Sequence, residues 1–221
     1  MSVRHLIFDL DGTLVDSAPL CAGIVNAMLS ERGSARRVTA EAARACLTRG
    51  GNQTVAALLA GECGEVEAEL ADFRARYMAM PTPAESLYPG VRDGLERLAA
   101  QGARLAICSN KPQALCDKIV ADLDLGEIIA AVVGSRPGLA LKPAPDLVAV
   151  TLDGLGAPPG DCLFVGDSEV DQRTAEAAGI PFLFVAYGYA EPGWRRDGLT
   201  AFADFDALAA HLGAPGLARV A

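Results

Sequence analysis

Near its N-terminus the chain reads Val3-Arg-His-Leu-Ile-Phe-Asp-Leu-Asp-Gly-Thr13. The apolar run over 3–8 has the length and composition of a buried strand, and the glycine behind the acidic residues indicates a turn. Side-chain direction repeats every two residues in an extended chain, so Asp9 and Asp11 leave the strand on the same face. The pattern predicts two carboxylates just beyond the C-terminal end of a buried strand.

From residue 91 onward, helical patterns alternate with short apolar runs. The predicted strands span 104–108, 128–133, 162–165 and 182–185, and the predicted helices span 91–100, 113–123, 145–152, 170–178 and 204–211. Such alternation is typical of βαβ units, which build a parallel sheet. The sequence therefore predicts an α/β fold with a doubly wound, Rossmann-like core.

The segment between residues 16 and 80 has no strand pattern. Its apolar residues recur at three- and four-residue spacing, as in Leu20, Ile24 and Met28, which predicts helices. Three prolines then stiffen residues 80–90, as is typical of a domain boundary. We predict a core domain of residues 1–15 and 88–221 and an inserted, all-helical cap domain of residues 16–87, with hinges near Val15 and Leu87.

Composition narrows the classes of function. Of 221 residues, 51% are hydrophobic and 21% charged, which indicates a folded protein. The net charge of -9 provides no attraction for nucleic acid or for an anionic membrane. The first apolar run is too short for a signal peptide or a membrane span, and the six cysteines form no CxxC pair. We expect a cytoplasmic protein with reduced thiols, either monomer or homodimer, that binds neither nucleic acid nor membrane.

Polar residues follow four of the predicted strands. Asp9 and Asp11 follow the first, the segment 109–111 follows the second, Lys142 lies in a longer loop after the third, and Asp167 follows the fourth. In open parallel sheets, ligand sites form beyond the carboxyl ends of the strands. Three carboxylates in one crevice would repel an anion unless a hard cation lay among them, so the set predicts Mg²⁺ and a phosphate together.

Phosphoryl transfer gives these residues distinct roles. With Mg²⁺ present, the Asp9 carboxylate is a competent nucleophile toward phosphorus. Asp11 would protonate the leaving alkoxide and then deprotonate the attacking water. The Ser109 hydroxyl and the Lys142 ammonium would stabilise the phosphoryl oxygens, and Lys142 would also hold Asp9 ionised. The predicted catalytic residues are Asp9, Asp11, Ser109 and Lys142.

The metal site needs further oxygen ligands. Asp167 is placed for direct contact with Mg²⁺, and Asp171 faces the same way one helical turn later. The predicted metal ligands are Asp9, Asp11, Asp167 and Asp171. Lys111 remains open between a surface residue and a site residue, and we leave it out of the catalytic set.

Four segments together resemble the motifs of the haloacid dehalogenase superfamily: Asp9-Leu-Asp-Gly-Thr-Leu-Val-Asp-Ser17, Cys108-Ser-Asn-Lys111, Leu141-Lys-Pro143 and Val165-Gly-Asp-Ser-Glu-Val-Asp171. The insertion resembles the helical cap of that superfamily's first type. The resemblance implies a nucleophile at Asp9, an acid/base at Asp11 whose backbone carbonyl also binds Mg²⁺, phosphate contacts from Ser109 and Lys142, and a metal aspartate at Asp167.

Within the superfamily, Leu87-Tyr-Pro-Gly-Val91 and Tyr187-Gly-Tyr189 resemble bacterial phosphoglycolate phosphatases. This implies a small phosphorylated metabolite as the partner, with glycolate 2-phosphate as the first substrate to consider. In the cap, the segment 49–52 is either a plain glycine-rich turn or the loop that covers the substrate. The predicted substrate-binding residues are Gly12, Thr13, Asn110, Arg49, Gly50 and Gly51.

Other activities of the superfamily fit less well. Dehalogenases typically lack the acid that stands here at Asp11, and phosphonoacetaldehyde hydrolases need a cap amine, whereas residues 16–80 contain no lysine. Three alternatives stay open: a phosphatase of wider range acting on sugar phosphates, nucleotides or pyrophosphate, a phosphosugar mutase, and a switch module that is phosphorylated on Asp9 without efficient turnover.

Overall fold

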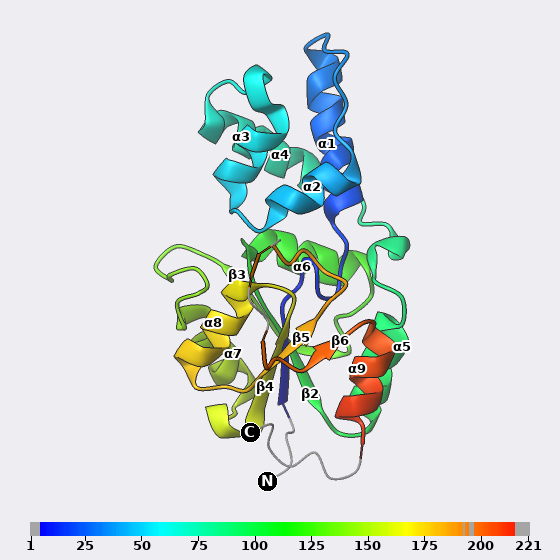
Figure 1. The fold of residues 1–221 in the computed structure, drawn as a ribbon, viewed down its shortest axis with the longest axis vertical. Helices are drawn as coiled ribbons and strands as arrows, with labels where there is room; N and C mark the ends of the chain where they lie inside the picture. Colours follow the sequence, from blue (N-terminus) through cyan, green and yellow to red (C-terminus); the bar gives the residue numbers. More distant parts are fainter. Residues whose placement is uncertain (1–4, 192, 195–196, 215–221) are drawn as a thin grey trace. The chain divides into compact units, whose positions relative to one another are not determined.

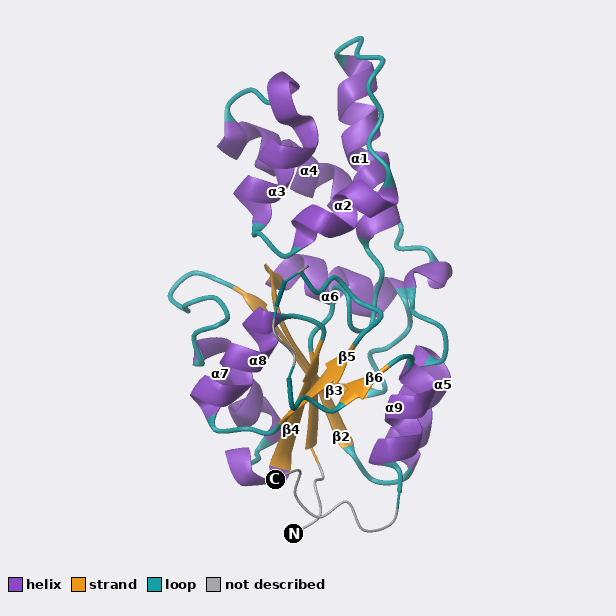
Figure 2. Cartoon of the chain, in the orientation of Figure 1, coloured by secondary structure: helices purple, strands orange, loops and turns teal. Residues whose placement is uncertain are grey.

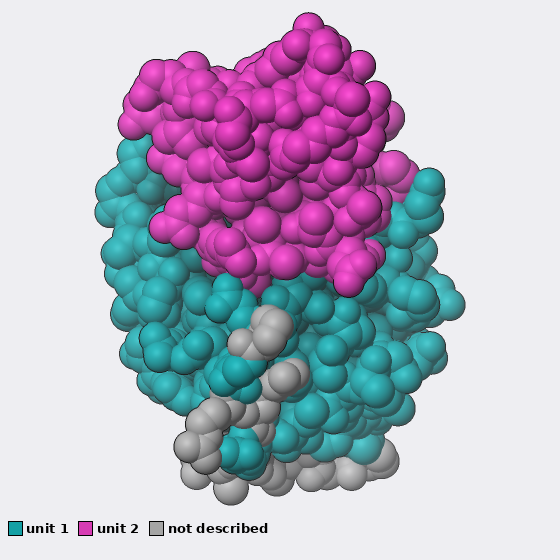
Figure 3. Space-filling view, turned by 45° about the horizontal axis from the view of Figure 1, so that its top comes forward, with its two compact units in different colours: residues 1–16, 84–221 teal, residues 17–83 magenta. Residues whose placement is uncertain are grey.

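The computed structural model describes residues 5–191, 193–194 and 197–214. The chain divides into two compact units, one of residues 1–16 and 84–221, here called the core, and one of residues 17–83, here called the cap (Figure 3). No helix among the described residues is long and apolar enough to cross a membrane.

The core is built on one six-stranded parallel sheet in the order β3-β2-β1-β4-β5-β6 (Figure 1). β1 lies at its centre, and the chain adds β2 and β3 on one side before it crosses over to add β4, β5 and β6 on the other. The direction of winding therefore reverses between β1 and β4, which is where open α/β sheets bind ligands. The strands are β1 (His5–Phe8), β2 (Arg104–Pro112), β3 (Ile129–Ser135), β4 (Cys162–Gly166), β5 (Phe182–Val185) and β6 (Ala201–Phe202).

Helices cover both faces of this sheet, as a doubly wound fold requires. α7 and α8 pack on one face and α5 and α9 on the other (Figure 2). Apolar side chains of the sheet, such as Ile7 and Phe164, are buried against Leu147 and Ala175 of the first pair, while Phe8 meets Phe205 of α9 with ring centroids 6.0 Å apart. The core helices are α5 (Val91–Ala100), α6 (Gln113–Asp122), α7 (Asp146–Leu155), α8 (Glu169–Ala178) and α9 (Phe205–Leu212).

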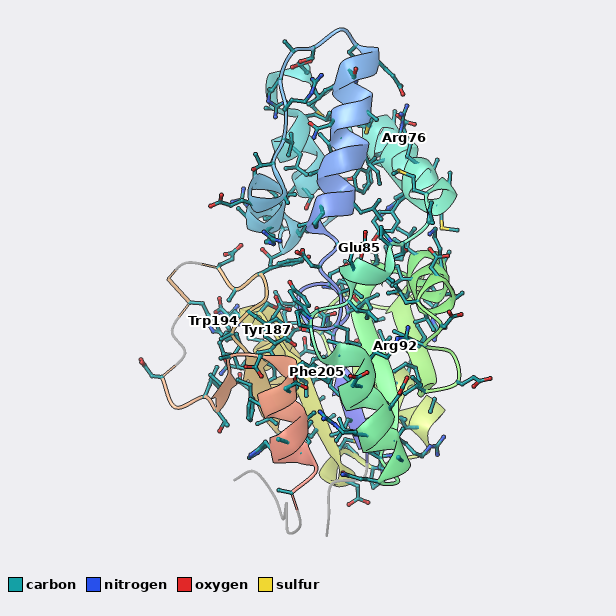
Figure 4. The ribbon with its side chains drawn as sticks, turned by 90° about the vertical axis from the view of Figure 1, so that its right-hand side faces the viewer. Arg76, Glu85, Arg92, Tyr187, Trp194 and Phe205 are labelled. Atoms are coloured by element: carbon teal, nitrogen blue, oxygen red, sulfur yellow. The ribbon has the colours of Figure 1, made fainter. Side chains whose placement is uncertain are left out.

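The cap is helical throughout, as the apolar spacing predicts. Leu20, Ile24 and Met28 are buried along one side of the first helix, and the Thr39 hydroxyl caps the second by accepting a hydrogen bond from the Ala42 N–H. Ion pairs tie its elements together, among them the pair of Arg76 with Glu31 at 2.6 Å (Figure 4). The cap helices are α1 (Ala18–Glu31), α2 (Ala40–Leu47), α3 (Gly51–Leu59) and α4 (Val66–Ala79).

The connections between the two units differ slightly from the predicted boundaries. The second one falls at 83–84, where the sequence predicts 87–88. The reason is that the segment after the prolines already pairs with the core: the Asp16 N–H donates to the Ser86 carbonyl at 2.7 Å, and the Tyr88 N–H donates to the Leu14 carbonyl at 3.1 Å. Short backbone pairing of this kind leaves no pattern in the side chains.

Candidate active site

Lys142 and Asp9 form the centre of the site. The Lys142 ammonium lies 2.9 Å from Asp9 Oδ1 and 2.7 Å from Asp171 Oδ1, and it donates to the Cys108 carbonyl at 3.1 Å. Burial disfavours its charged form, but the carboxylates of Asp171 and Asp9 outweigh that effect and raise the pKa of Lys142. The ammonium is therefore a permanent, fixed cation beside Asp9.

Asp9 stands at the carboxyl end of the central strand and is almost buried. Burial raises the pKa of its carboxyl to about 6 against the opposing charge of Lys142, and the charges of Asp171 and Asp11 add to the rise. Although Lys142 is close to Oδ1, the pair lacks hydrogen-bond geometry, and this oxygen accepts no hydrogen bond from the described residues. A buried carboxylate oxygen in this state suits a metal ion or an electrophile.

Asp167 is held in place by two hydrogen bonds and by close packing against the backbone. Its Oδ1 accepts from the Thr13 hydroxyl at 3.0 Å, and its Oδ2 accepts from the Tyr189 N–H at 2.6 Å. Glycines make room for it, since a Cβ on Gly12 or on Gly188 would lie 2.3 Å from an Asp167 atom. Burial, with the charges of Asp171 and Asp9, raises the pKa of Asp167 well above its ordinary value, while the two hydrogen bonds oppose the rise.

Asp171 uses both of its oxygens inside the protein. Oδ1 binds Lys142, and Oδ2 accepts from the Asp167 N–H at 3.2 Å and from the Ser168 hydroxyl at 2.6 Å. The Ser168 hydroxyl in turn caps α8, which completes a capping box. This geometry lets Asp171 position Lys142 and begin α8, and it leaves little free lone-pair capacity for a metal.

Asp11 pairs with a residue that lies outside the predicted catalytic set. The Lys111 ammonium reaches both of its oxygens, at 2.9 and 3.1 Å, and the Lys111 side chain is only 9% exposed. The sequence left Lys111 open between surface and site because a lysine beside a loop is usually solvated. Lys111 lies two residues after Ser109 on the same extended strand, so both side chains leave the strand on the same face. That spacing is the signal that could have indicated a site residue.

Ser109 and Asn110 follow the buried part of β2. Ser109 is buried, and its hydroxyl oxygen accepts a hydrogen bond from the Lys111 N–H, with 3.4 Å between the oxygen and the nitrogen. The Asn110 amide spans the backbone of Lys142: Nδ2 donates to the carbonyl at 3.0 Å and Oδ1 accepts from the N–H at 2.7 Å. Asn110 thus fixes the loop that delivers Lys142 to the site.

The aspartates form a group that could hold a metal ion. Asp9, Asp167 and Asp171 each offer an oxygen, and these atoms lie within 4.8 Å of one another. Three carboxylates and the Lys142 ammonium leave two net negative charges, which a divalent cation would balance. The Asp9 oxygen that accepts no hydrogen bond from the described residues and the all-oxygen donor set fit a hard cation such as Mg²⁺. The side chain of Asp11 lies outside this group.

The predicted residues of the cap lie together within the cap. Arg49, Gly50 and Gly51 line a hollow of about 540 Å³ with Asn52 at the start of α3 and with Leu70 and Arg74 of α4. Gly50 has a φ of 86°, which favours glycine, and it starts α3 by accepting from the Thr54 N–H. Arg74 was not predicted, since an arginine on an amphipathic helix gives no signal of its own.

Two tyrosines after β5 bind the loop that follows β1 in the core. The Tyr187 hydroxyl donates to the Thr13 carbonyl and the Tyr189 hydroxyl to Asp16 Oδ1, both at 2.8 Å. Tyr187 also packs on Tyr88 with ring centroids 4.7 Å apart, and Figure 4 shows it in the core with Phe205. The sequence alone gives Tyr187 and Tyr189 no role beyond a family resemblance, because their hydrogen-bond partners are more than 170 positions away in the chain.

Comparison with known proteins agrees with this geometry. Residues 6–185 match the family described as haloacid dehalogenase-like hydrolase. A phosphoglycolate phosphatase of Rhodospirillum rubrum is 36% identical over 225 residues, covering 96% of this chain and 92% of that protein. The structure of a predicted phosphoglycolate phosphatase from Haemophilus somnus 129pt aligns with a TM-score of 0.79 and 25% identity, over 94% of this chain and 97% of that one.

A third protein shares the fold at lower identity. The structure of CbbY from Rhodobacter sphaeroides, in complex with phosphate, aligns with a TM-score of 0.75 and 23% identity, over 93% of this chain and 96% of that one. The four motifs of the core therefore lie within a region that is matched by sequence and by fold.

Proposed function

This chain belongs to the haloacid dehalogenase-like hydrolase family, and on that premise we propose that it is a Mg²⁺-dependent phosphatase that hydrolyses a small phosphate monoester through a phosphoryl group on Asp9. The observation that carries the proposal is the fixed Lys142 ammonium, 2.9 Å from an Asp9 oxygen that accepts no hydrogen bond from the described residues. A carboxylate held beside a permanent cation stays available for attack on phosphorus.

The reaction then divides into two displacements. Asp9 attacks phosphorus and the ester oxygen leaves, taking a proton from Asp11. In the second step Asp11 accepts a proton from water, whose oxygen attacks the phosphoryl group and frees Asp9. Lys142 and the Ser109 hydroxyl stabilise the phosphoryl oxygens in both steps. The short spacing of Asp9 and Asp11 just after β1 supports giving both carboxylates a part in the same reaction.

Mg²⁺ would be held by the carboxylates of Asp9 and Asp167, and it would neutralise charge on the phosphoryl oxygens. The Thr13 hydroxyl and the Tyr189 N–H orient Asp167 for this task. Asp171 acts through Lys142, and Asn110 acts through the backbone of Lys142. We assign Gly12 a steric role, because only a residue without a side chain lets the backbone lie this close to Asp167.

Glycolate 2-phosphate is the first substrate to test, because relatives that align over most of this chain are named phosphoglycolate phosphatase. The cap hollow around Arg49, Gly50 and Gly51 is our candidate for contacts that select a small anionic substrate, since its lining has two arginines against one carboxylate, Glu67.

The test is phosphate release with Mg²⁺ from a panel of small phosphate esters that includes 2-phosphoglycolate. We expect strong release from 2-phosphoglycolate that disappears in the Asp9→Asn variant and in EDTA. Weak and even release across the panel would keep the chemistry and remove 2-phosphoglycolate as the substrate. No metal-dependent release from any ester would favour a mutase, which needs a bisphosphate primer, or a phosphorylated switch.

A further inference from the structure

Lys111 has no part in the reaction as set out above, yet it is a nearly buried cation at the site. Its ammonium meets both Asp11 oxygens at 2.9 and 3.1 Å. Its backbone is closely packed: Gly134 lies so near that an added Cβ would be 2.7 Å from the Lys111 carbonyl oxygen, and the Cys116 thiol donates to that oxygen at 3.5 Å. The position of this lysine is therefore set by the core and not by solvent.

The two lysines of the site have different charge partners. Lys142 lies against Asp9 and Asp171 and serves the phosphoryl group. Lys111 lies against Asp11, the residue that must turn to the leaving oxygen to protonate it. When Asp11 turns, the Lys111 ammonium loses both of these contacts at a side-chain exposure of only 9%. An anion of the substrate can then take the place that Asp11 leaves beside this ammonium.

The leaving part of the substrate can supply that anion. In glycolate 2-phosphate a carboxylate is bonded to the same carbon that carries the ester oxygen, so it arrives next to the atom that Asp11 must reach. A carboxylate that takes the place of Asp11 on Lys111 both binds the substrate and frees Asp11 for proton transfer. An ester without such a group leaves Asp11 held by Lys111.

Resting on the proposed function, we propose that Lys111 determines substrate specificity by binding a carboxylate of the leaving group, so that the site selects phosphate esters of small hydroxy acids. The substrate carboxylate then replaces Asp11 as the partner of the Lys111 ammonium. This assigns discrimination to a core residue, whichever contacts the cap adds.

The experiment compares two esters of equal carbon number, 2-phosphoglycolate and ethyl phosphate, by steady-state kinetics with Mg²⁺. For wild type we expect the higher kcat/KM with 2-phosphoglycolate. Lys111→Met should lower the ratio of the two kcat/KM values by about tenfold to a hundredfold, the range of a hydrogen bond between charged groups. Most of the loss should appear as a raised KM for 2-phosphoglycolate, and Lys111→Arg should recover part of the ratio.

Lys118→Met is the matched control, since Lys118 pairs with Asp122 on α6 and should leave both kinetic constants unchanged. Thermal unfolding of each variant checks that it is folded. An equal loss with both esters would overturn the inference, because Lys111 would then act only by holding Asp11, and an unchanged ratio would overturn it as well. If wild type hydrolyses neither of these esters but releases phosphate from another ester of the panel, the inference alone is overturned, whereas no release from any ester would reject the proposed function itself.

Discussion

At the scale of single residues, charge balance organises the site. Lys142 touches two carboxylates and a backbone carbonyl, while its aliphatic stem is almost completely removed from water. An ammonium buried in this way is tolerated only because its partners outweigh the cost of desolvation. Those partners are ordered by other contacts, Asp171 by the capping box of α8 and the Lys142 backbone by Asn110. The catalytic cation is thus also a structural one.

Lys142→Met should therefore lower stability as well as activity. We expect a loss of about 3–5 kcal/mol in the free energy of unfolding, because the buried carboxylates of Asp9 and Asp171 lose their counter-charge. Phosphate release should fall by about a hundredfold or more. Urea unfolding in EDTA measures the first effect, with Lys118→Met as the control, for which a half-buried pair within one helix predicts a smaller loss than the fully buried Lys142. Equal stability of the two variants would contradict this reading.

At the scale of elements, the segment after β5 joins Asp167 to the loop that follows β1. Its backbone binds Asp167, and its two hydroxyls bind Thr13 and Asp16. The middle residue must be glycine for steric reasons, since a Cβ on Gly188 would lie 2.3 Å from both the Asp167 Cβ and the Gly12 carbonyl oxygen. The segment is therefore a part of the site that carries no charge of its own.

Gly188→Ala tests this role. The added methyl group should push Asp167 away from its place and weaken Mg²⁺ binding by about tenfold to a hundredfold, with a loss of about 1–3 kcal/mol in stability from overpacking. Titration of phosphatase activity with Mg²⁺ measures the affinity. Gly126→Ala is the control, because nothing lies within 4 Å of its added Cβ. An unchanged Mg²⁺ requirement in Gly188→Ala would show that the segment does not support the metal site.

The sequence predicted those helices and strands whose bounds follow from the pattern of apolar side chains alone. The bounds of α5 and β5 agree with the prediction, and the other core helices agree within a few residues, because each shows a buried apolar face. β6 escaped prediction, since two residues give no periodicity. Two contacts were also not predicted: the ion pair of Lys111 with Asp11 and the hydrogen bond from the Tyr189 N–H to Asp167. Each joins residues from different loops that meet only in the folded protein.

At the scale of the whole molecule, the metal-free core has an excess of buried negative charge. Because the folded-state pKa of Asp9 is raised from 3.8 to about 6, the folded protein retains a proton that the unfolded chain has lost. The stability that Asp9 contributes therefore falls as the pH rises from about 4 to about 6, and it is lost above that range. Asp167 acts in the same direction. A divalent cation should remove this penalty.

Mg²⁺ should accordingly raise the melting temperature more at pH 7.5 than at pH 5. At the lower pH the metal must displace a proton from Asp9 as well as from Asp167, whereas at pH 7.5 Asp9 is already ionised. Thermal unfolding with and without MgCl₂ at both pH values measures the difference, and Asp167→Asn should reduce the shift at pH 7.5. A shift that is equal at the two pH values, or larger at pH 5, would contradict the account of the buried carboxylates.

The central claim is that the phosphoryl group passes through Asp9. It is tested most directly by rapid quenching of a single turnover of 2-phosphoglycolate, followed by peptide mass spectrometry. We predict that the peptide containing Asp9 transiently gains the mass of one phosphoryl group on that residue, and that Asp9→Asn shows neither the adduct nor phosphate release. A phosphoryl group on another residue, or undiminished phosphate release by Asp9→Asn, would contradict the claim.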